Sequence, residues 1–223
     1  MAETLAEALA NIRNILADKP VQLIAVSKQA TCKQMEEAFS LGVTEFGENR
    51  VQDALKKRSD LSPALVQSSH WHFIGHLQTN KVKQVVGNFD LIHSVDSLRL
   101  AKEISEQATN KGLVQKILLQ VKVLEDPSKS GFTPQSLRSS LAEILSLNAI
   151  SVEGLMTICP QSSDPSTWRR CFKGLSELKI ELENSHQIKL QELSMGMTDD
   201  WNEAIAYGAT MIRIGRALFD RSA

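Results

Sequence analysis

The chain has 223 residues, of which 42% are hydrophobic, 25 are basic and 26 are acidic. This length and apolar content suit one large α/β domain, residues 1–223, and leave no room for a second full domain. Because the net charge is −1 and charged residues of both signs are dispersed along the chain, we expect no nucleic acid and no anionic membrane as a partner, but a small molecule.

The cysteines and the first residues indicate a compartment. Cys32, Cys159 and Cys171 are far apart and odd in number, without the paired spacing of a zinc or dithiol redox site, so we interpret them as reduced thiols. Residues 1–5 are acidic where a secretory signal would be basic, and no apolar run approaches the roughly 18 residues that span a bilayer. We therefore expect a cytoplasmic protein.

Short β-branched runs alternate with stretches of helical period, which is the pattern of βα units on a parallel sheet. An extra N-terminal helix is predicted at 5–17, ahead of the first strand. Further helices are predicted at 33–41, 97–109 and 134–147. The predicted strands are 21–27, 44–46, 71–74, 91–94, 116–123, 152–158, 189–194 and 210–214.

Eight consecutive βα units favour a single (β/α)₈ TIM barrel, because an open parallel sheet usually has about five or six strands. The alternative is a doubly wound open sheet. The length lies toward the short end for a barrel, so we expect short loops, with a polar loop at 162–166. Catalytic and binding residues of such barrels lie at the C-terminal ends of the strands, which is where we searched for a site.

The first predicted strand ends in Lys28, a charged residue after an apolar run. A lysine there can reach the barrel mouth, where loss of water favours a nucleophilic amine that forms a Schiff base. The alternative is a solvated lysine at the end of a strand. Lys28 alone is a weak signal.

The loops after the seventh and eighth strands resemble a phosphate site, which TIM barrels often place there. In the first loop Ser194 offers donors and Gly196 permits close backbone approach. In the second, Gly215 and Arg216 open a short helix whose free N–H groups favour an anion. The alternative is a pair of ordinary glycine turns. With Lys28 on the same rim, the pattern predicts a phosphorylated carbonyl compound as ligand.

Three further residues are candidates for contact with the ring of such a ligand. Alternation along the eighth strand places Arg213 on the opposite face from Ile212 and Ile214, where it could pair with a pyridine nitrogen or, as an alternative, with a carboxylate inside the barrel. Asn49 could bond a ring hydroxyl or cap the next helix. Met156 could pack on the ring, although methionine there is more often core.

Histidines crowd the third unit, at His70, His72 and His76. We do not predict a metal site, because no acidic or cysteine ligand completes a set at familiar spacing. We expect His76, Asn80 and Lys81 to line the mouth or cap the following helix instead.

The chain resembles the pyridoxal-phosphate homeostasis proteins, the YggS-type family of PLP-binding proteins, over essentially its whole length. The matching stretches are AVSK at 25–28, FGENRVQ at 46–52, HFIGHLQTNK at 72–81, GLM at 154–156, LSMGMT at 193–198 with Asp200, and IRIG at 212–215.

This resemblance implies a fold similar to the alanine racemase N-terminal domain, with pyridoxal 5′-phosphate held as a Schiff base on Lys28. It implies Ser194, Gly215 and Arg216 around the phosphate, and Arg213 facing the pyridine nitrogen. It also implies a carrier or regulator without known catalysis, which maintains vitamin B6 and the amino-acid and keto-acid balance. Partners would be PLP-dependent apo-enzymes or a regulatory protein.

Two other functions stay open at this point. A PLP-dependent amino-acid racemase or decarboxylase needs a second acid/base, typically a tyrosine, and the only tyrosine, Tyr207, falls in a predicted helix at 201–207 that should turn it away from the mouth. A sugar-phosphate aldolase would use Lys28 without any cofactor. Because no second domain is predicted after the eighth strand, we expect a monomer without enzymatic activity.

Overall fold

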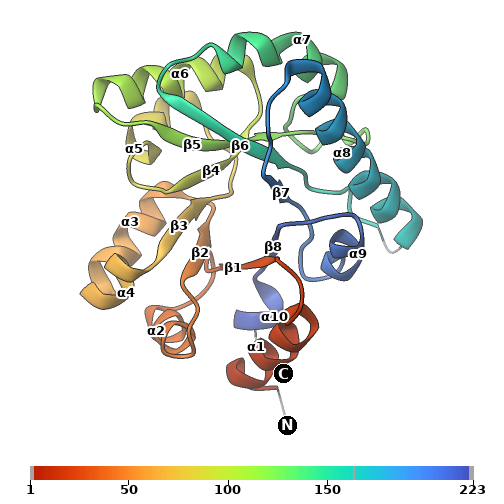
Figure 1. The fold of residues 1–223 in the computed structure, drawn as a ribbon. Coiled ribbons are helices and arrows are strands. Elements are labelled where there is room, and N and C mark those ends of the chain that lie inside the picture. Colours follow the sequence, from red (N-terminus) through yellow and green to blue (C-terminus); the bar gives the residue numbers. More distant parts are fainter. Residues whose placement is uncertain (1–2, 163, 221–223) are drawn as a thin grey trace.

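The structure is a computed structural model that describes residues 3–162 and 164–220. Residues 1–2 and 221–223 and Ser163, which falls in the predicted polar loop, lie outside the described residues. In the described part, eight parallel strands follow one another around a closed barrel (Figure 1). The barrel closes because β1 pairs with β8, with residues 22–25 opposite 211–214. The (β/α)₈ prediction is confirmed, and the open-sheet alternative is wrong.

The strands lie where the β-branched runs predicted them, with ends that differ by a few residues. Each strand is covered on both faces, on one by the barrel interior and on the other by helices. The strands are β1 (Gln22–Val26), β2 (Glu45–Glu48), β3 (His70–Phe73), β4 (Leu91–Val95), β5 (Gln115–Gln120), β6 (Ile150–Met156), β7 (Glu192–Ser194) and β8 (Met211–Ile214).

Helices surround the barrel, and several begin at the caps that their sequences supply (Figure 1). Thr4, Thr31 and Thr133 each accept a hydrogen bond from a backbone N–H in the first turn of a helix. The helices are α1 (Leu5–Leu16), α2 (Cys32–Ser40), α3 (Val51–Asp60), α4 (Pro63–Ser68), η1 (Thr79–Lys81), α5 (Val82–Val85), α6 (Leu98–Asn110), α7 (Pro134–Leu145), α8 (Pro165–His186), α9 (Trp201–Ala206) and α10 (Arg216–Phe219).

The helices predicted at 33–41, 97–109 and 134–147 are confirmed as α2, α6 and α7, with ends that differ by at most two residues. The extra N-terminal helix is confirmed as α1, which lies beside α10 (Figure 1). The polar loop predicted to reach residue 166 is wrong at its end, because α8 begins at Pro165 with the Asp164 carboxylate as its cap. Proline at the first helical position is favourable, since its missing N–H would be unpaired there. No helix in the described ranges is long and apolar enough to cross a membrane.

Side chains alternate between the barrel interior and the helical layer. Ile212 and Ile214 of β8 belong to the large apolar cluster that fills the space between strands and helices. Met211 belongs to a separate cluster inside the barrel. Arg213 shares the interior face with Met211, as the alternation predicted. This register decides which side chains reach the barrel mouth.

Candidate functional site

A cavity of about 550 Å³ opens at the C-terminal ends of the strands, where the sequence predicted a site. Its volume is in the range of small-molecule sites. Five of the eight predicted site residues line it: Lys28, Asn49, Arg213, Gly215 and Arg216. They come from the loops after β1 and β2, from β8 itself and from the turn into α10, so the barrel brings together residues that are distant in sequence.

Lys28 lies in the loop after β1, with its side chain exposed at the cavity. The side chain is therefore in contact with water in this structure, and not removed from water as expected. The preceding residue, Ser27, is fully buried. Its N–H donates to the carbonyl of Gly47 at 3.0 Å, which ties the segment before Lys28 to β2. The amine thus extends into the cavity from a fixed backbone.

A buried ion pair that the sequence reasoning missed supports this backbone. Lys57 of α3 donates to a carboxylate oxygen of Glu48 at 2.9 Å and to the carbonyl of Ser27 at 2.5 Å. The Ser27 hydroxyl donates to the same oxygen of Glu48 at 2.7 Å. A charged residue at the end of an otherwise buried strand is the signal that could have revealed Glu48. The pair fixes the loop that carries Lys28.

Arg213 is 3% exposed and lines the cavity. Its guanidinium donates to the Ser194 hydroxyl at 2.6 Å and to the carbonyl of Thr157 at 2.9 Å. The alternative of an ion pair inside the barrel is wrong for the described residues, since no carboxylate lies within ion-pair distance of Arg213. Burial lowers the pKa of Arg213 to about 10, although Asp200 and Cys159 act in the opposite direction. The guanidinium therefore stays a cation at neutral pH.

Gly215 and Arg216 form the turn from β8 into α10. The first backbone bonds of the helix are made by the N–H groups of Leu218 and Phe219, which both donate to the carbonyl of Gly215. The first N–H groups of a helix have no partner within the helix, so they are donors for other groups. The Arg216 side chain is exposed and pairs with Asp199 across the cavity rim. This turn supplies donors and a cation for an anionic group.

Asn49 is half-buried in the wall of the cavity. The cap position of α3 is Arg50, and no side chain caps that helix, so the alternative role of Asn49 as a helix cap is wrong. Gly75, from the loop after β3, lies against the Asn49 backbone, where a Cβ atom would come within 2.1 Å of the Asn49 carbonyl oxygen. A glycine is required there because the two loops are in contact.

Three predicted residues do not line the cavity. The Ser194 side chain is fully buried, with its hydroxyl engaged by Arg213 and His93, so the expected phosphate contact from this side chain is wrong. Met156 is fully buried in the apolar cluster inside the barrel, one layer below Ile158, which does line the cavity. Strand alternation explains both results, because these side chains point into the barrel before its mouth is reached.

Gly196 is the third predicted residue that does not line the cavity. It has a φ of +93°, and a Cβ atom there would come within 2.9 Å of Trp201 Cα and 2.7 Å of Ala204 Cβ. The glycine is needed for the loop to turn closely over α9, and its expected backbone approach to a ligand stays a prediction. The residues that follow it, Met197 and Thr198, line the cavity instead.

The sequence reasoning also missed the apolar walls of the cavity. Val26, Ile74 and Ile158 come from strand ends and the residues that follow them. Apolar side chains one step beyond a buried strand are the signal that predicts such walls. His76 lines the cavity as expected and is bonded to the Ser130 hydroxyl at 3.2 Å. Lys81 takes the cap position of α5 but makes no capping bond with its side chain.

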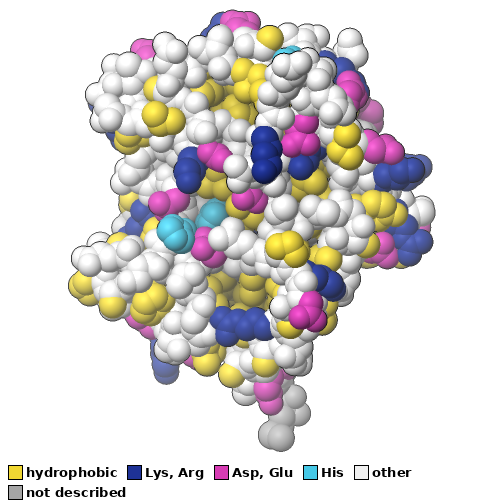
Figure 2. Space-filling view, in the orientation of Figure 1, with side chains coloured by type: hydrophobic (Ala, Val, Ile, Leu, Met, Phe, Trp, Pro, Cys, Tyr) yellow, Lys and Arg dark blue, Asp and Glu magenta, His cyan; other side chains and the backbone are white. Residues whose placement is uncertain are grey.

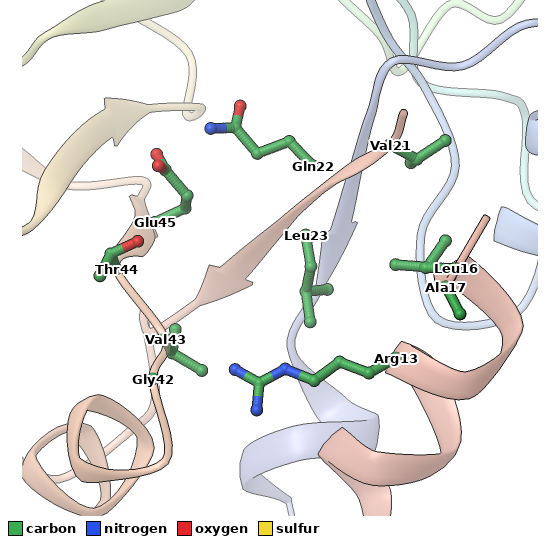
Figure 3. A pocket seen from close by; sticks show the side chains of 10 residues that line it. All are labelled: Arg13, Leu16, Ala17, Val21, Gln22, Leu23, Gly42, Val43, Thr44 and Glu45. Atoms are coloured by element: carbon green, nitrogen blue, oxygen red, sulfur yellow. The ribbon is translucent and has the colours of Figure 1, made fainter. Parts of the chain in front are cut away.

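Two other cavities lie near the N-terminal ends of the strands. One, of about 470 Å³, is lined by Arg13, Val21 and Leu23 among others (Figure 3). Its cation is already engaged, because Arg13 donates to the carbonyl of Leu41 at 2.7 Å. The other, of about 290 Å³, contains His70 and His72. In residues 3–162 and 164–220, no group of three histidine, cysteine or acidic side chains is arranged to hold a metal ion.

The cavity at the mouth therefore combines four features. It has a free primary amine on Lys28, a buried cation on Arg213, backbone donors and a cation at the turn of Gly215 and Arg216, and apolar walls. An aldehyde reacts with the amine, a phosphate suits the turn, and a flat ring suits the apolar walls. The residues present thus fit a phosphorylated aromatic aldehyde.

Comparisons with known proteins match nearly the whole chain. Residues 2–222 match the family model described as alanine racemase, N-terminal domain. A pyridoxal phosphate homeostasis protein of Synechocystis sp. is 42% identical over 207 residues, which cover 92% of this chain and 94% of that protein. A protein of the same description from Aquifex aeolicus is 41% identical over 198 residues, covering 89% of this chain and 86% of that one.

Solved structures give the same result. The structure of PipY from Synechococcus elongatus with PLP bound has a TM-score of 0.91 and 40% identity, and the match covers 97% of this chain and 100% of that chain. An alanine racemase of Clostridium difficile has a TM-score of 0.81 but 16% identity, and the match covers 56% of that enzyme. Similarity at this low identity shows the fold alone.

Proposed function

Because the chain belongs to the alanine racemase N-terminal domain family, and within it to the pyridoxal phosphate homeostasis proteins, we propose that it binds pyridoxal 5′-phosphate at the barrel mouth and takes part in homeostasis of this cofactor. The observation that carries the proposal is the presence of the Lys28 amine, the Arg213 guanidinium and the turn at Gly215 in one cavity. The PipY structure, which has PLP bound, supports it.

Each residue then has a task. When bound, the cofactor supplies a reactive aldehyde and an electron-accepting ring. Lys28 would hold the aldehyde end of the cofactor through its amine. The turn at Gly215 and Arg216 would hold the phosphate, and Asn49 would bond the hydroxyl group of the ring. Arg213 would lie at the pyridine nitrogen, where its permanent cation would keep that nitrogen unprotonated and weaken the ring as an electron acceptor.

We further infer that the protein is a carrier or regulator and not an enzyme. The arrangement at Arg213 supports this, because a weak electron acceptor is unsuited to stabilising a carbanion. Tyr207 supports it as well, since it ends α9, outside the cavity lining, and its carbonyl accepts a hydrogen bond from Ser176. A racemase or decarboxylase has support only from distant structural neighbours of 16% and 13% identity.

The remaining expectations belong to the same proposal. A carrier would act in the cytoplasm as a monomer and hand the cofactor to PLP-dependent apo-enzymes or respond to a regulatory protein. The exposed position of Lys28 supports transfer, because an acceptor lysine of another protein can approach it.

The proposal is tested by titrating the protein with pyridoxal 5′-phosphate and recording the visible absorption of the lysine-linked form. Lys28→Ala should abolish that absorption and leave weak binding through the phosphate. Lys129→Ala is the matched control, because Lys129 lines the same cavity but has no assigned role, and it should keep the absorption. Equal spectra for the protein and Lys28→Ala would overturn the assignment. Assays with amino acids then distinguish a carrier from a racemase or decarboxylase.

A further inference from the structure

A chain of four hydrogen bonds crosses the barrel interior and ends at Arg213. Arg213 of β8 contacts the Ser194 hydroxyl of β7 at 2.6 Å, and this hydroxyl lies 2.9 Å from Nδ1 of His93 in β4. Nε2 of His93 lies 2.9 Å from Nδ1 of His72 in β3. Nε2 of His72 lies 2.7 Å from a carboxylate oxygen of Glu45 in β2. Each link joins side chains of two different strands.

The two ends of this hydrogen-bond chain, together with the requirement that the hydroxyl proton of Ser194 has a partner, set the direction of every bond. A guanidinium can only donate and an ionised carboxylate can only accept. Ser194 therefore accepts from Arg213 and donates its own proton to Nδ1 of His93. His93 then donates from Nε2 to Nδ1 of His72, and His72 donates from Nε2 to Glu45. Both rings are neutral in this arrangement, and every ring nitrogen has a partner.

The burial of His93 agrees with a neutral ring at this position. Side-chain exposure is 4% for His72, and His93 and Ser194 are fully buried. Burial, the neighbouring His72 and the cation of Arg213 lower the pKa of His93 well below its usual range. A chain of bonds that all point the same way is polarised from the cation at one end to the anion at the other.

Glu45 lies at the far end of the barrel from the mouth. It projects from the start of β2 beside Gln22 of β1 (Figure 3) and lines the cavity of about 290 Å³ together with His72. In Figure 2 histidine and acidic side chains lie together over β2 and β3. The chain therefore connects the two ends of the barrel through its core.

Resting on the proposed function, we infer that Glu45, His72, His93 and Ser194 are positioning residues for Arg213, which hold its guanidinium in one orientation at the cofactor site. TIM-barrel interiors are usually filled by branched apolar side chains, so a polar chain there is unusual and costly unless every member is satisfied. Its members are satisfied only if the bonds run toward Glu45. Glu45 thereby affects the orientation of the Arg213 guanidinium at the mouth through three intervening side chains.

The hydrogen-bond chain is tested by long-range ¹⁵N nuclear magnetic resonance of the histidine rings, without added cofactor. At pH 7, His72 and His93 should both carry the proton on Nε2 and none on Nδ1. A charged ring, or a proton on Nδ1 of either residue, would overturn the inference. The Arg213 side-chain nitrogens should give separate signals, because the bonds to Ser194 and Thr157 hinder rotation of the guanidinium.

The link to the cofactor site is tested with variants and the dissociation constant of pyridoxal 5′-phosphate. His93→Leu breaks the chain and should weaken binding about tenfold, shift the visible absorption and merge the Arg213 signals. His93→Gln can accept from Ser194 and donate to His72, so it should bind within about threefold of the original protein. Glu45→Gln, remote from the mouth, should shift the absorption in the same direction as His93→Leu. Glu153→Gln is the matched control, since Glu153 lines the same N-terminal cavity outside the chain.

The possible outcomes separate this inference from the proposed function. If His93→Leu and Glu45→Gln both bind and absorb like the original protein while Lys28→Ala does not, the inference fails and the proposed function stands. If the original protein does not bind the cofactor, the proposed function fails, and the histidine spectra still decide whether the chain exists. Should His93→Leu fail to fold, Ser194→Ala and Glu45→Gln give the same test at other links.

Discussion

At the scale of single residues, the site depends on buried polar groups that hold its exposed ones. Lys28 is exposed, but the backbone before it is fixed by the bonds among Ser27, Glu48 and Lys57. Arg213 is fixed in the same way through Ser194. Groups that contact a ligand can thus be accessible while their positions are set from the core.

The first prediction concerns His93 and pH. Because its pKa is lowered in the folded protein, the unfolded chain takes up a proton below about pH 6.5 that the folded protein does not. The free energy of unfolding should therefore fall with decreasing pH by up to about 1.4 kcal/mol per pH unit from this residue. His93→Gln removes the effect, so urea unfolding from pH 7.5 to 5 should show a shallower slope for the variant.

The exposed His70 provides the control for this experiment. His70→Gln is the same substitution at an exposed histidine outside the hydrogen-bond chain, so the change in slope should be specific to His93→Gln. A slope unchanged in His93→Gln would contradict the assignment of a buried neutral ring.

The second prediction concerns the ion pair of Lys57 and Glu48. Glu48 is fully buried, so Lys57→Met leaves its carboxylate without a counter-charge and should reduce the free energy of unfolding by about 3 kcal/mol in urea unfolding. Arg138→Met is the control, since the pair of Arg138 and Glu181 is exposed to water, so its loss should reduce the free energy of unfolding much less than Lys57→Met does. Equal losses in the two variants would show that the buried pair does not support the loop of Lys28.

At the scale of elements, loops are positioned by close contact with neighbouring elements. The loop after β7 is bonded to the start of α9, where the N–H of Met197 donates to the Asp200 carboxylate at 2.6 Å. Burial raises the pKa of Asp200, and the bond from Met197 opposes this. The turn at Gly196 is what brings Met197 and Thr198 to the cavity.

The third prediction separates this close contact from backbone strain. Gly196 and Gly208 have similar positive φ angles, +93° and +85°, but a Cβ atom meets α9 only at Gly196, and nothing within 4 Å at Gly208. Gly208→Ala should lower the free energy of unfolding by about 1 kcal/mol, from strain alone. Gly196→Ala should lower it by about 2–4 kcal/mol and also weaken cofactor binding. Equal effects of the two variants on cofactor binding would contradict a role for the position of this loop in binding.

The elements were predicted from sequence more completely than the site. β-branched runs marked all the strands because each strand is buried on both faces. Ser194 and Met156 lie outside the cavity lining, since whether a side chain near a strand end reaches the mouth depends on the stagger of neighbouring strands, which a single sequence does not contain. The chain from Glu45 to Arg213 was missed for the same reason, because its members lie on five strands.

At the scale of the whole molecule, closure of the barrel brings the first and last strands of the polypeptide together. β1 pairs with β8, which places Lys28 beside the turn at Gly215, where a Cβ atom would lie 3.2 Å from Val26. A ligand that contacts the loops after β1 and β8 therefore links these two strands. Binding is therefore expected to stabilise the closed barrel.

The fourth prediction follows from this linkage. Pyridoxal 5′-phosphate at about 100 times its dissociation constant should add about 2.7 kcal/mol to the free energy of unfolding. For a chain of this length the melting temperature should rise by about 5–10 °C. Pyridoxal without the phosphate should give a smaller rise at the same concentration, because the turn at Gly215 and Arg216 is then unused. Equal rises would contradict the phosphate assignment.

The most direct test of the account is reduction of the protein with borohydride in the presence of pyridoxal 5′-phosphate, followed by peptide mapping. The account predicts one stable phosphopyridoxyl group, on Lys28, and its loss in Lys28→Ala. A modification on another lysine such as Lys129, or no modification at all, would contradict the assignment of Lys28 as the residue that holds the cofactor.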